Sequence, residues 1–320
     1  MTQPGSGDPH AEPTIDRSLL VHRLAPAMRW LVRRGYFGFE VEGRQHVPRE
    51  GRAIYAANHA GWFALDAFFL GLAVAEVAGP WRTPFFATAD AALAAPVLGP
   101  ALRRVGAIPA SWFRRPERLP SEVQACGFFP EGVEGNTKPF WQAYRMRPWK
   151  RGFVKAAAAL GAPVVPVAIL GGEESLPVAW TVRVLEPVIG SIVGLPLAWI
   201  PLPARWRVVF HEPIAVPPAA REDNALATRI ADQARQVVAA TLAREAADRP
   251  LARLSTAVAR ASGEPAEASE RAAPAPAPKA SPPAPAPEAA PGSASSRERP
   301  GPGARRQAPV GRRTRARSRR

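Results

Sequence analysis

Residues 53–66 read Ala-Ile-Tyr-Ala-Ala-Asn-His-Ala-Gly-Trp-Phe-Ala-Leu-Asp, and this stretch decides the fold and the chemistry that we expect. Its first part, Ala53–Ala57, is a short apolar run typical of a buried strand. A glycine-containing turn follows, and we expect a helix to begin near Ala64. The chain therefore passes from a strand to a helix, and it places His59 and Asp66 at the junction.

An imidazole paired with a carboxylate can remove the proton of an alcohol, so that the alcohol attacks an acyl group. The pair needs direct contact, but a continuous helix would hold His59 and Asp66 roughly 10 Å apart. A non-helical turn must therefore lie between them, and Gly61 supplies the backbone freedom for it. Taken alone, the two residues are better explained as a polar strand end and a carboxylate favoured by a helix N-terminus.

A second motif, Phe129-Pro130-Glu131-Gly132, follows downstream. Together and in this order, the two motifs resemble sequence blocks of the glycerolipid acyltransferase superfamily, whose members move a fatty acyl group from a thioester to a lipid hydroxyl. The family's first block has four residues between its histidine and aspartate, whereas six separate His59 from Asp66, a spacing of a divergent branch. The apolar run Val164–Ile169, with its proline, resembles the fourth block. The resemblance covers roughly residues 36–215.

The resemblance implies a role for each matching residue. His59 would be the general base, Asp66 would orient it, and Glu131 and Gly132 would help to bind the acyl acceptor. Acyl-CoA or acyl carrier protein would be the co-substrate, with no bound cofactor and no metal. The alternative for Glu131 is a tight Pro-Glu-Gly turn with an exposed carboxylate.

Two departures from the family's pattern bear on the acceptor. In the family's second block, an arginine that binds a phosphate lies six residues after a glycine. In this chain, the residue six positions after Gly106 is Trp112. Nearby arginines could replace it, namely Arg103, Arg104, Arg114 and Arg115. In the third block, Glu134 stands where the family has an arginine. Because a carboxylate repels a phosphate monoester, we expect a neutral or zwitterionic acceptor such as a diacylglycerol, a lysophospholipid or a long-chain alcohol, rather than lysophosphatidic acid.

Apolar runs of strand length alternate with helix-like segments along the chain, which indicates an α/β protein. We expect a single domain over residues 18–248, with a central mixed β-sheet surrounded by helices. Residues 1–17 predict a disordered N-terminus. Residues 249–320, rich in Pro, Ala and Arg, predict a disordered basic tail, because they cannot bury enough apolar surface to fold. The expected strands are Phe37–Glu42, Ala53–Ala57, Thr83–Ala87, Val105–Pro109, Cys126–Phe129, Val164–Ile169 and Arg207–Phe210. We also expect a short helix over Leu119–Ala125 and a helical or irregular segment, interrupted by prolines, over Leu93–Arg104.

The formal net charge is +15, and residues 251–320 hold 14 basic and 5 acidic residues. Such an excess of positive charge favours anionic partners. The candidates are lipid headgroups, the phosphates of an acyl donor and, least favoured, nucleic acid. The one cysteine, Cys126, excludes an internal disulfide, and we expect it in the core. The five histidines form no tight cluster in the sequence, so we expect no metal site.

Three segments bear on membrane association. Leu19–Arg34 predicts a basic amphipathic helix, which could lie in a membrane interface or pack on the domain. Lys138–Lys155 mixes basic and aromatic residues, so it could bind a lipid interface or the phosphates of the acyl donor. The alternatives are a loop packed on the domain and, least favoured, a segment that binds nucleic acid. Val188–Leu202 is apolar but too short to span a bilayer, so it predicts a monotopic insertion or a buried loop.

The sequence shows no apolar run of membrane-spanning length and no signal-peptide pattern at its start. We therefore expect a peripheral or monotopic protein at the cytoplasmic face of a membrane, with membrane lipids as partners. Two other hypotheses stay open. One is a non-catalytic membrane binder built on a degenerate acyltransferase domain, and the other is a nucleic-acid binder led by the basic tail.

Overall fold

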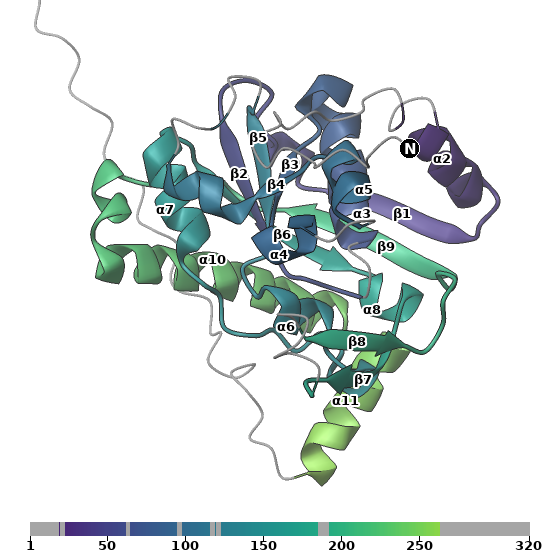
Figure 1. Cartoon of the computed structure of the whole chain (residues 1–320). Helices are drawn as coiled ribbons and strands as arrows, with labels where there is room; N and C mark the ends of the chain where they lie inside the picture. Colours follow the sequence, from purple (N-terminus) through teal and green to yellow (C-terminus); the bar gives the residue numbers. More distant parts are fainter. Residues whose placement is uncertain are drawn as a thin grey trace, which may run out of the picture. The chain divides into compact units, whose positions relative to one another are not determined.

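The computed structural model describes residues 19, 23–61, 65–94, 98–115, 119, 123–184 and 192–262. A seven-stranded sheet in the order β1-β9-β6-β2-β5-β3-β4 forms its centre (Figure 1). All neighbouring strands are parallel except β6 and β9, which are antiparallel, so the sheet is mixed as predicted. The strands are β1 (Phe37–Glu42), β2 (Ala53–Ala57), β3 (Phe85–Thr88), β4 (Ala107–Pro109), β5 (Ala125–Phe128), β6 (Val164–Leu170) and β9 (Ala204–Phe210).

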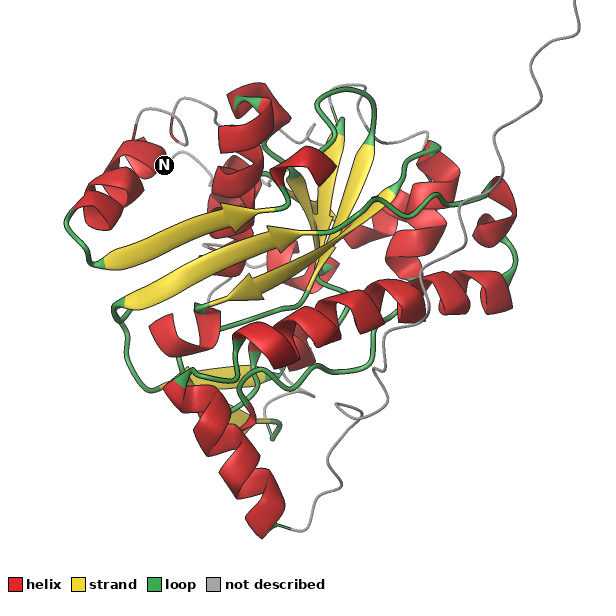
Figure 2. Ribbon diagram, turned by 180° about the vertical axis from the view of Figure 1, so that it is seen from behind, coloured by secondary structure: helices red, strands yellow, loops and turns green. Residues whose placement is uncertain are grey.

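Helices surround this sheet, which confirms the predicted α/β class (Figures 1 and 2). The α-helices are α2 (Ala25–Arg33), α3 (Leu65–Ala78), α4 (Asp90–Ala94), α5 (Leu98–Arg104), α6 (Val133–Asn136), α7 (Gly152–Leu160), α8 (Gly172–Ser175), α10 (Asn224–Glu245) and α11 (Pro250–Ala261). Short 3-10 helices are η2 (Arg44–His46), η4 (Pro80–Arg82), η5 (Ala110–Arg114), η7 (Phe140–Gln142) and η8 (Pro218–Arg221).

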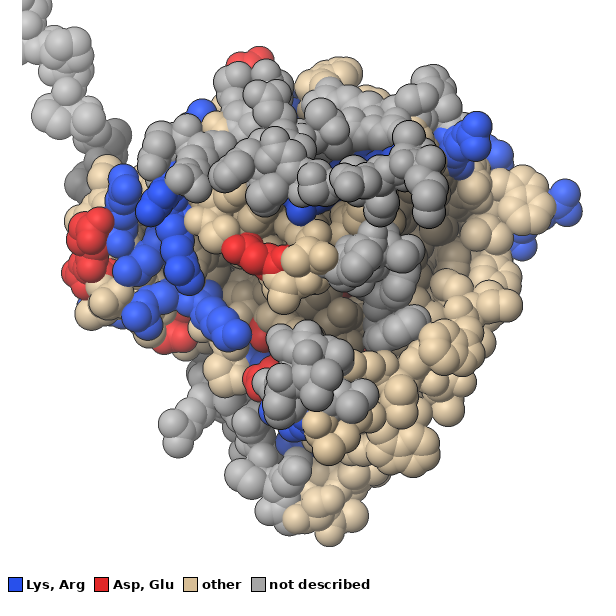
Figure 3. Space-filling view, in the orientation of Figure 1, with Lys and Arg blue, Asp and Glu red and all other residues tan. Residues whose placement is uncertain are grey.

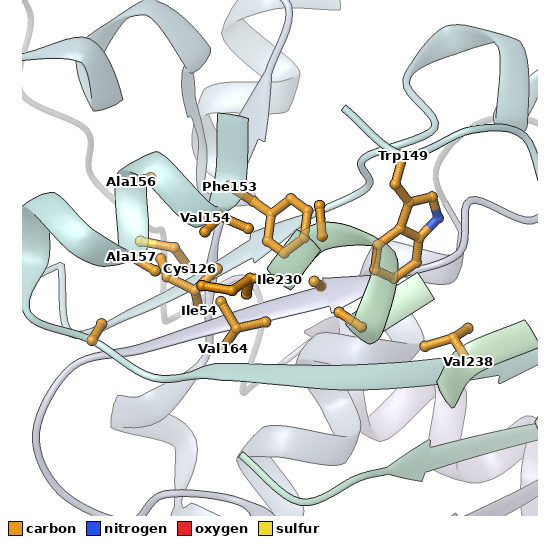
Figure 4. Packing of buried hydrophobic residues seen from close by; sticks show 14 of the residues in the cluster. Ile54, Cys126, Trp149, Phe153, Val154, Ala156, Ala157, Val164, Ile230 and Val238 are labelled. Atoms are coloured by element: carbon orange, nitrogen blue, oxygen red, sulfur yellow. The ribbon is translucent and has the colours of Figure 1, made fainter. Parts of the chain in front are cut away.

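Two clusters of buried side chains pack on the two faces of the sheet, because alternate residues of a strand point to opposite faces. On one face, Ile54 and Val164 pack with α7 and α10, and Cys126 lies among them as predicted (Figure 4). On the other face, Tyr55 and Val165 pack against α3. Every residue of β6 is buried, which is expected for a central strand covered on both sides. Burial raises the pKa of the Cys126 thiol to about 12, so the thiol stays protonated.

The structure differs from the expected elements in three places. The predicted apolar segment 188–202 contains a strand, β8 (Val193–Pro196), which pairs with β7 (Val178–Val182) in a separate two-stranded antiparallel sheet. A helix predicted over residues 119–125 is wrong at its C-terminal end, since β5 already begins at Ala125. The segment predicted over residues 93–104 forms two helices, α4 and α5.

The ordered chain also continues past residue 248, where we expected the tail to begin. Helix α11 starts with a proline at its first turn and buries Ser255 and Ala259, four residues apart on one face. The prediction of disorder is therefore wrong for residues 249–262, while residues 1–17 and 263–320 lie outside the described part of the chain. Within that described part, no helix combines the length and the apolar character that a bilayer crossing requires.

Candidate active site

The two motifs meet because their strands are neighbours. His59 lies just after β2, and Glu131 lies just after β5. These strands pair in parallel, with Ala56 opposite Phe128, so their carboxyl ends lie at the same edge of the sheet. Loops at such an edge are where open α/β sheets place ligands. The sheet register therefore brings the histidine and the acidic turn together.

The side chains of His59 and Asp66 are in direct contact. Nδ1 of the ring lies 2.6 Å from Oδ2 of Asp66, which is the contact that the sequence predicted. The carboxylate is fully buried, and it also accepts hydrogen bonds from the backbone N–H groups of Ala60 and Ala67, both at 2.8 Å. Because a carboxylate only accepts, the ring carries its proton on Nδ1, and Nε2 is left as the basic nitrogen.

The aromatic ring of Phe129 fixes the plane of the imidazole. The two rings stack with centroids 4.3 Å apart and planes 19° from parallel. The His59 side chain keeps 12% of its surface exposed, so the stacked ring is held in place but is still accessible. A ring that is both oriented and accessible is what a general base requires.

The backbone turn that separates His59 from Asp66 depends on two glycines. Gly61 has φ +79°, and a Cβ on it would lie 2.2 Å from the carbonyl oxygen of Gly172. A Cβ on Gly172 would in turn lie 2.3 Å from the carbonyl oxygen of Ala60. The start of α8 and the turn after β2 therefore interlock, backbone against backbone. The sequence indicated the first glycine, but only the fold shows that Gly172 is its partner.

Asn58 fastens the same turn to the centre of the sheet. Its side-chain amide donates to the carbonyl oxygen of Ile169 at 2.9 Å and accepts from the Ile169 N–H at 2.8 Å. Both bonds are buried, and they lie on β6, beside β2. These two hydrogen bonds fix the end of β2 relative to β6. Because His59 directly follows Asn58, they also restrict the position of its backbone.

Glu131 is buried, and its two oxygens bind the protein itself. Oε1 accepts from the backbone N–H of His59 at 3.1 Å, and Oε2 accepts from the N–H of Arg147 at 2.8 Å. The exposed turn that sequence allowed as an alternative is wrong, since only 1% of Glu131 is exposed. Both oxygens face backbone donors, and the acceptor-binding role of Glu131 stays a prediction. Gly132, with φ +66°, lies beside Glu131 and next to Lys150 Nζ, and its acceptor-binding role stays a prediction.

A buried charged cluster, which the sequence did not indicate, lies behind Glu131. Lys138 Nζ is 3.5 Å from Glu131 Oε2 and 3.3 Å from Glu173 Oε1, and all three side chains are buried. Burial alone would lower the pKa of Lys138, but attraction by Glu131 and Glu173 outweighs it and raises that pKa. Burial raises the pKa of Glu173, against the attraction of Lys138. The cluster connects the acidic turn to α8 through Glu173.

The four predicted phosphate-binding arginines lie apart from this centre. Among the hydrogen bonds and ion pairs of the described residues, none joins them to His59, Asp66 or Glu131. Arg103 and Arg104 end α5 and precede β4, so they lie toward the opposite edge of the sheet, and Arg103 donates to the Leu93 carbonyl. Arg114 and Arg115 follow β4 at the same edge as His59, and both are exposed.

The segment Lys138–Lys155 packs on the domain over much of its length. Ala143, Met146 and Trp149 belong to the first core cluster, which supports the interpretation as a packed loop for these residues. Lys150 and Arg151 remain exposed near α7. Figure 3 shows a group of basic side chains on this part of the surface. These cations lie at the edge of the sheet where His59 and Glu131 meet.

A cavity of about 330 Å³ opens beside α6. Its lining carries both signs of charge and several polar groups, including Glu134, Lys138, Gln142, Arg147, Thr181 and Arg183. Lys138 connects the cavity to Glu131, and through it to the backbone of His59. Sequence reasoning singled out Glu134 but missed Arg183, which directly follows β7 and lies 3.4 Å from the Glu134 carboxylate.

Comparison with known proteins gives three findings. A family model described as Acyltransferase matches residues 38–170, which contain both motifs. Uncharacterized proteins of Mycobacterium bovis (Mb0514) and Mycobacterium tuberculosis (Rv0502) are 33% identical over 256 residues, covering 76% of this chain and 68% of theirs. The crystal structure of the 1-acyl-sn-glycerophosphate acyltransferase PlsC from Thermotoga maritima aligns with a TM-score of 0.47 at 16% identity, covering 73% of this chain and 82% of PlsC. The matched region spans the histidine, the aspartate and the acidic turn whose geometry is described above, and the chain belongs to the acyltransferase family.

Proposed function

We propose that this acyltransferase moves a fatty acyl group from acyl-CoA or acyl carrier protein to the hydroxyl of a glycerolipid or lysophospholipid. The observation that carries the proposal is the 2.6 Å contact between His59 Nδ1 and the buried Asp66 carboxylate, beside the acidic turn. The enzyme would act as a peripheral or monotopic protein at the cytoplasmic face of a membrane, where such acceptors reside.

In this mechanism, Nε2 of His59 accepts the proton of the acceptor hydroxyl while the oxygen attacks the thioester carbonyl carbon. Asp66 holds the Nδ1 proton and stabilises the imidazolium that forms. The tetrahedral intermediate then collapses, the carbon–sulfur bond breaks, and the leaving thiolate takes the proton back from the imidazolium. General base catalysis of this kind contributes about 10²–10⁴-fold in rate. Protein side chains suffice for each proton transfer in this scheme.

The lining of the cavity supports a zwitterionic acceptor. Glu134 supplies a carboxylate, and Arg147 and Arg183 supply guanidinium groups within the same 330 Å³ space. Arg183 lies 3.4 Å from Glu134, so the carboxylate does not repel phosphate as an isolated charge would. A headgroup with one phosphate and one ammonium group matches both signs of charge. A lysophospholipid of this type is therefore the acceptor that we propose first.

The test is acylation of a panel of acceptors with a labelled acyl-CoA and a labelled acyl carrier protein. The panel compares zwitterionic lysophospholipids, lysophosphatidic acid, diacylglycerol and a long-chain alcohol. Wild type should acylate the zwitterionic lysophospholipids, and His59→Ala should lose about 10²-fold or more of the rate. His46→Ala, at a partly exposed histidine in η2, is the matched control and should stay active.

Two results would count against the proposal. A fully active His59→Ala variant would exclude this histidine as the base. Acylation of lysophosphatidic acid alone would show that the cavity does not select for a zwitterion.

A further inference from the structure

A group of large apolar side chains lies exposed on β7, on β8 and on the loop after β8. Trp199 and Ile200 keep 76% and 74% of their surface exposed. We name this group the apolar hairpin surface, and its members are Trp180, Leu195, Leu197, Trp199, Ile200 and Leu202. In Figure 3 the region of β7 and β8 is mostly tan, with few charged side chains. Soluble monomers rarely leave a contiguous apolar patch of this kind uncovered, so the surface needs a partner.

The backbone beneath this surface is fixed, so the exposure is built into the fold. The Leu197 N–H donates to the Pro177 carbonyl at 2.8 Å, and the Leu202 N–H donates to the Ser175 carbonyl at 2.7 Å. Between them, the Tyr36 hydroxyl donates to the Pro201 carbonyl at 2.7 Å. Prolines in this loop carry no N–H donor, which lowers the cost of placing the backbone in an apolar environment. The loop is therefore anchored at its backbone while its apolar side chains point outward.

The segments that form and flank the apolar hairpin surface carry positive charge, although the Glu134 carboxylate of α6 lies 3.4 Å from Arg183. Helix α2 carries Arg29 and Arg33, followed by Arg34, whose guanidinium lies 5.4 Å from the centre of the half-exposed Trp30 ring. The Tyr36–Pro201 hydrogen bond joins the strand after α2 to the apolar loop. Within the described residues 23–36, 175–184 and 192–206 there are six arginines and no aspartate or glutamate. Aromatic and apolar side chains flanked by arginines fit the boundary between acyl chains and anionic headgroups.

We propose that the apolar hairpin surface, together with α2, docks this enzyme on a membrane that contains anionic lipids. The proposal rests on the proposed function, since a lipid acceptor would have to be drawn from such a membrane. It is also consistent with the location of the site. Ser175, which anchors the loop, ends α8, and α8 begins at Gly172, which packs against the turn that carries His59. The docking surface and the base are therefore connected by one short helix.

The test is co-sedimentation of the full chain with vesicles of phosphatidylcholine alone and of phosphatidylcholine mixed with phosphatidylglycerol. Wild type should bind the mixed vesicles more tightly. The double variant Leu197→Glu/Ile200→Glu should lose about tenfold or more of the partition coefficient on both vesicles, because two apolar contacts become charged. Trp81→Glu, at an equally exposed aromatic residue in η4, is the matched control and should bind like wild type.

The charge contribution has its own variant. Arg29→Ala/Arg33→Ala should weaken binding to mixed vesicles by about fivefold for each arginine and should leave binding to phosphatidylcholine unchanged. His59→Ala should bind both vesicles like wild type, which separates docking from catalysis. Circular dichroism melting of each variant verifies that it is folded.

Two outcomes would overturn the proposal. In one, the double glutamate variant binds vesicles as well as wild type does. In the other, sedimentation velocity shows that wild type is a dimer, that the double variant is a monomer, and that neither sediments with vesicles. The apolar hairpin surface would then be the contact between two copies of the chain. An assay of acyl transfer by wild type to an acceptor dispersed in detergent separates the two proposals. If transfer is intact while one of these two outcomes is found, the docking proposal fails and the proposed function stands.

Discussion

The carboxylate of Glu131 accepts a hydrogen bond from the backbone N–H of His59, with 3.1 Å between Oε1 and the nitrogen. Its other oxygen accepts from the N–H of Arg147 at 2.8 Å. The glutamate of the acidic turn therefore positions the backbone of His59, the proposed base. The two motifs are connected in this way: one supplies the imidazole, and the other fixes the turn that carries it.

Glu131→Gln should lower both stability and kcat. The glutamine side chain has one oxygen and one NH2 group, so it cannot accept from the N–H groups of His59 and Arg147 in the same way. Its NH2 group would face one of these two backbone N–H donors, and that hydrogen bond would be lost. Losing one buried hydrogen bond costs about 1–3 kcal/mol. Urea unfolding measures the stability, and steady-state kinetics should show a lower kcat with a nearly unchanged KM. A large rise in KM alone would indicate that Glu131 binds the acceptor after all.

Lys138→Met should destabilise the domain by about 3–5 kcal/mol, because it leaves two buried carboxylates without their cation. Adding Glu173→Gln removes one of those charges, so the double variant should recover part of the loss. Unfolding free energies of the wild type, both single variants and the double variant give the coupling energy, which we expect to be about 1–3 kcal/mol. Strictly additive effects would show that Lys138 and Glu173 do not interact.

Gly135→Ala should impair catalysis although Gly135 touches no substrate in the mechanism. A Cβ there would lie 2.6 Å from Glu131 Cβ and 2.9 Å from His59 Cβ, and neither of these atoms can rotate away. The overpacked contact should cost about 1–3 kcal/mol and displace the base. Gly152→Ala is the control, since nothing lies within 4 Å of its added Cβ, and it should be neutral or stabilising by about 0.4–1 kcal/mol. Equal kcat values for the two variants would contradict this packing argument.

Acid should destabilise the fold through His211. Burial, with smaller effects of Arg244 and His46, lowers the pKa of His211 to about 4, whereas an unfolded histidine titrates near pH 6.5. Between these values the unfolded chain binds more protons, so stability falls as the pH drops from about 6.5 to 4. After allowance for solvent around the partly exposed ring, the loss at pH 5 is roughly 1 kcal/mol.

His211→Gln should remove this part of the pH dependence. The comparison is the urea midpoint of wild type and variant at pH 7 and at pH 5. The partly buried His46 gives the comparison variant, His46→Gln, which should keep most of the wild-type slope because His46 makes only a small contribution to the lowered pKa of His211. An unchanged slope in His211→Gln would show that other groups cause the acid effect.

Local sequence patterns were sufficient to predict the strands of the sheet and the non-helical turn after β2. The apolar runs at Ala53–Ala57 and Val164–Ile169 form strands, and the distance argument around Gly61 correctly required a non-helical turn. Both features depend on residues close together in the chain. The contact between His59 and Asp66 was predicted only with the help of the second motif and the family resemblance, because the short stretch alone left a structural role for both residues open.

Contacts between distant segments could not be derived in this way. Glu131 has the same sequence neighbours whether it is exposed or buried, and only the register of β2 and β5 brings it to the His59 backbone. Arg183 reaches Glu134 because β7 folds back beside α6, and the apolar composition around β7 gave no indication of this pairing. Helix α11 was missed because the composition of residues 249–320, averaged together, concealed a short amphipathic repeat.

The pairing of β1 with β9 has a consequence for biosynthesis. Among the strands that the structure describes, β1 pairs with β9 alone, and Phe37 lies opposite Ala204, which is far from it in the sequence. A ribosome making this protein must therefore release β9 before the first strand can join the fold. Until then the apolar side of the nascent amino-terminal segment stays without its native cover, and it is a site where a chaperone could bind the growing chain.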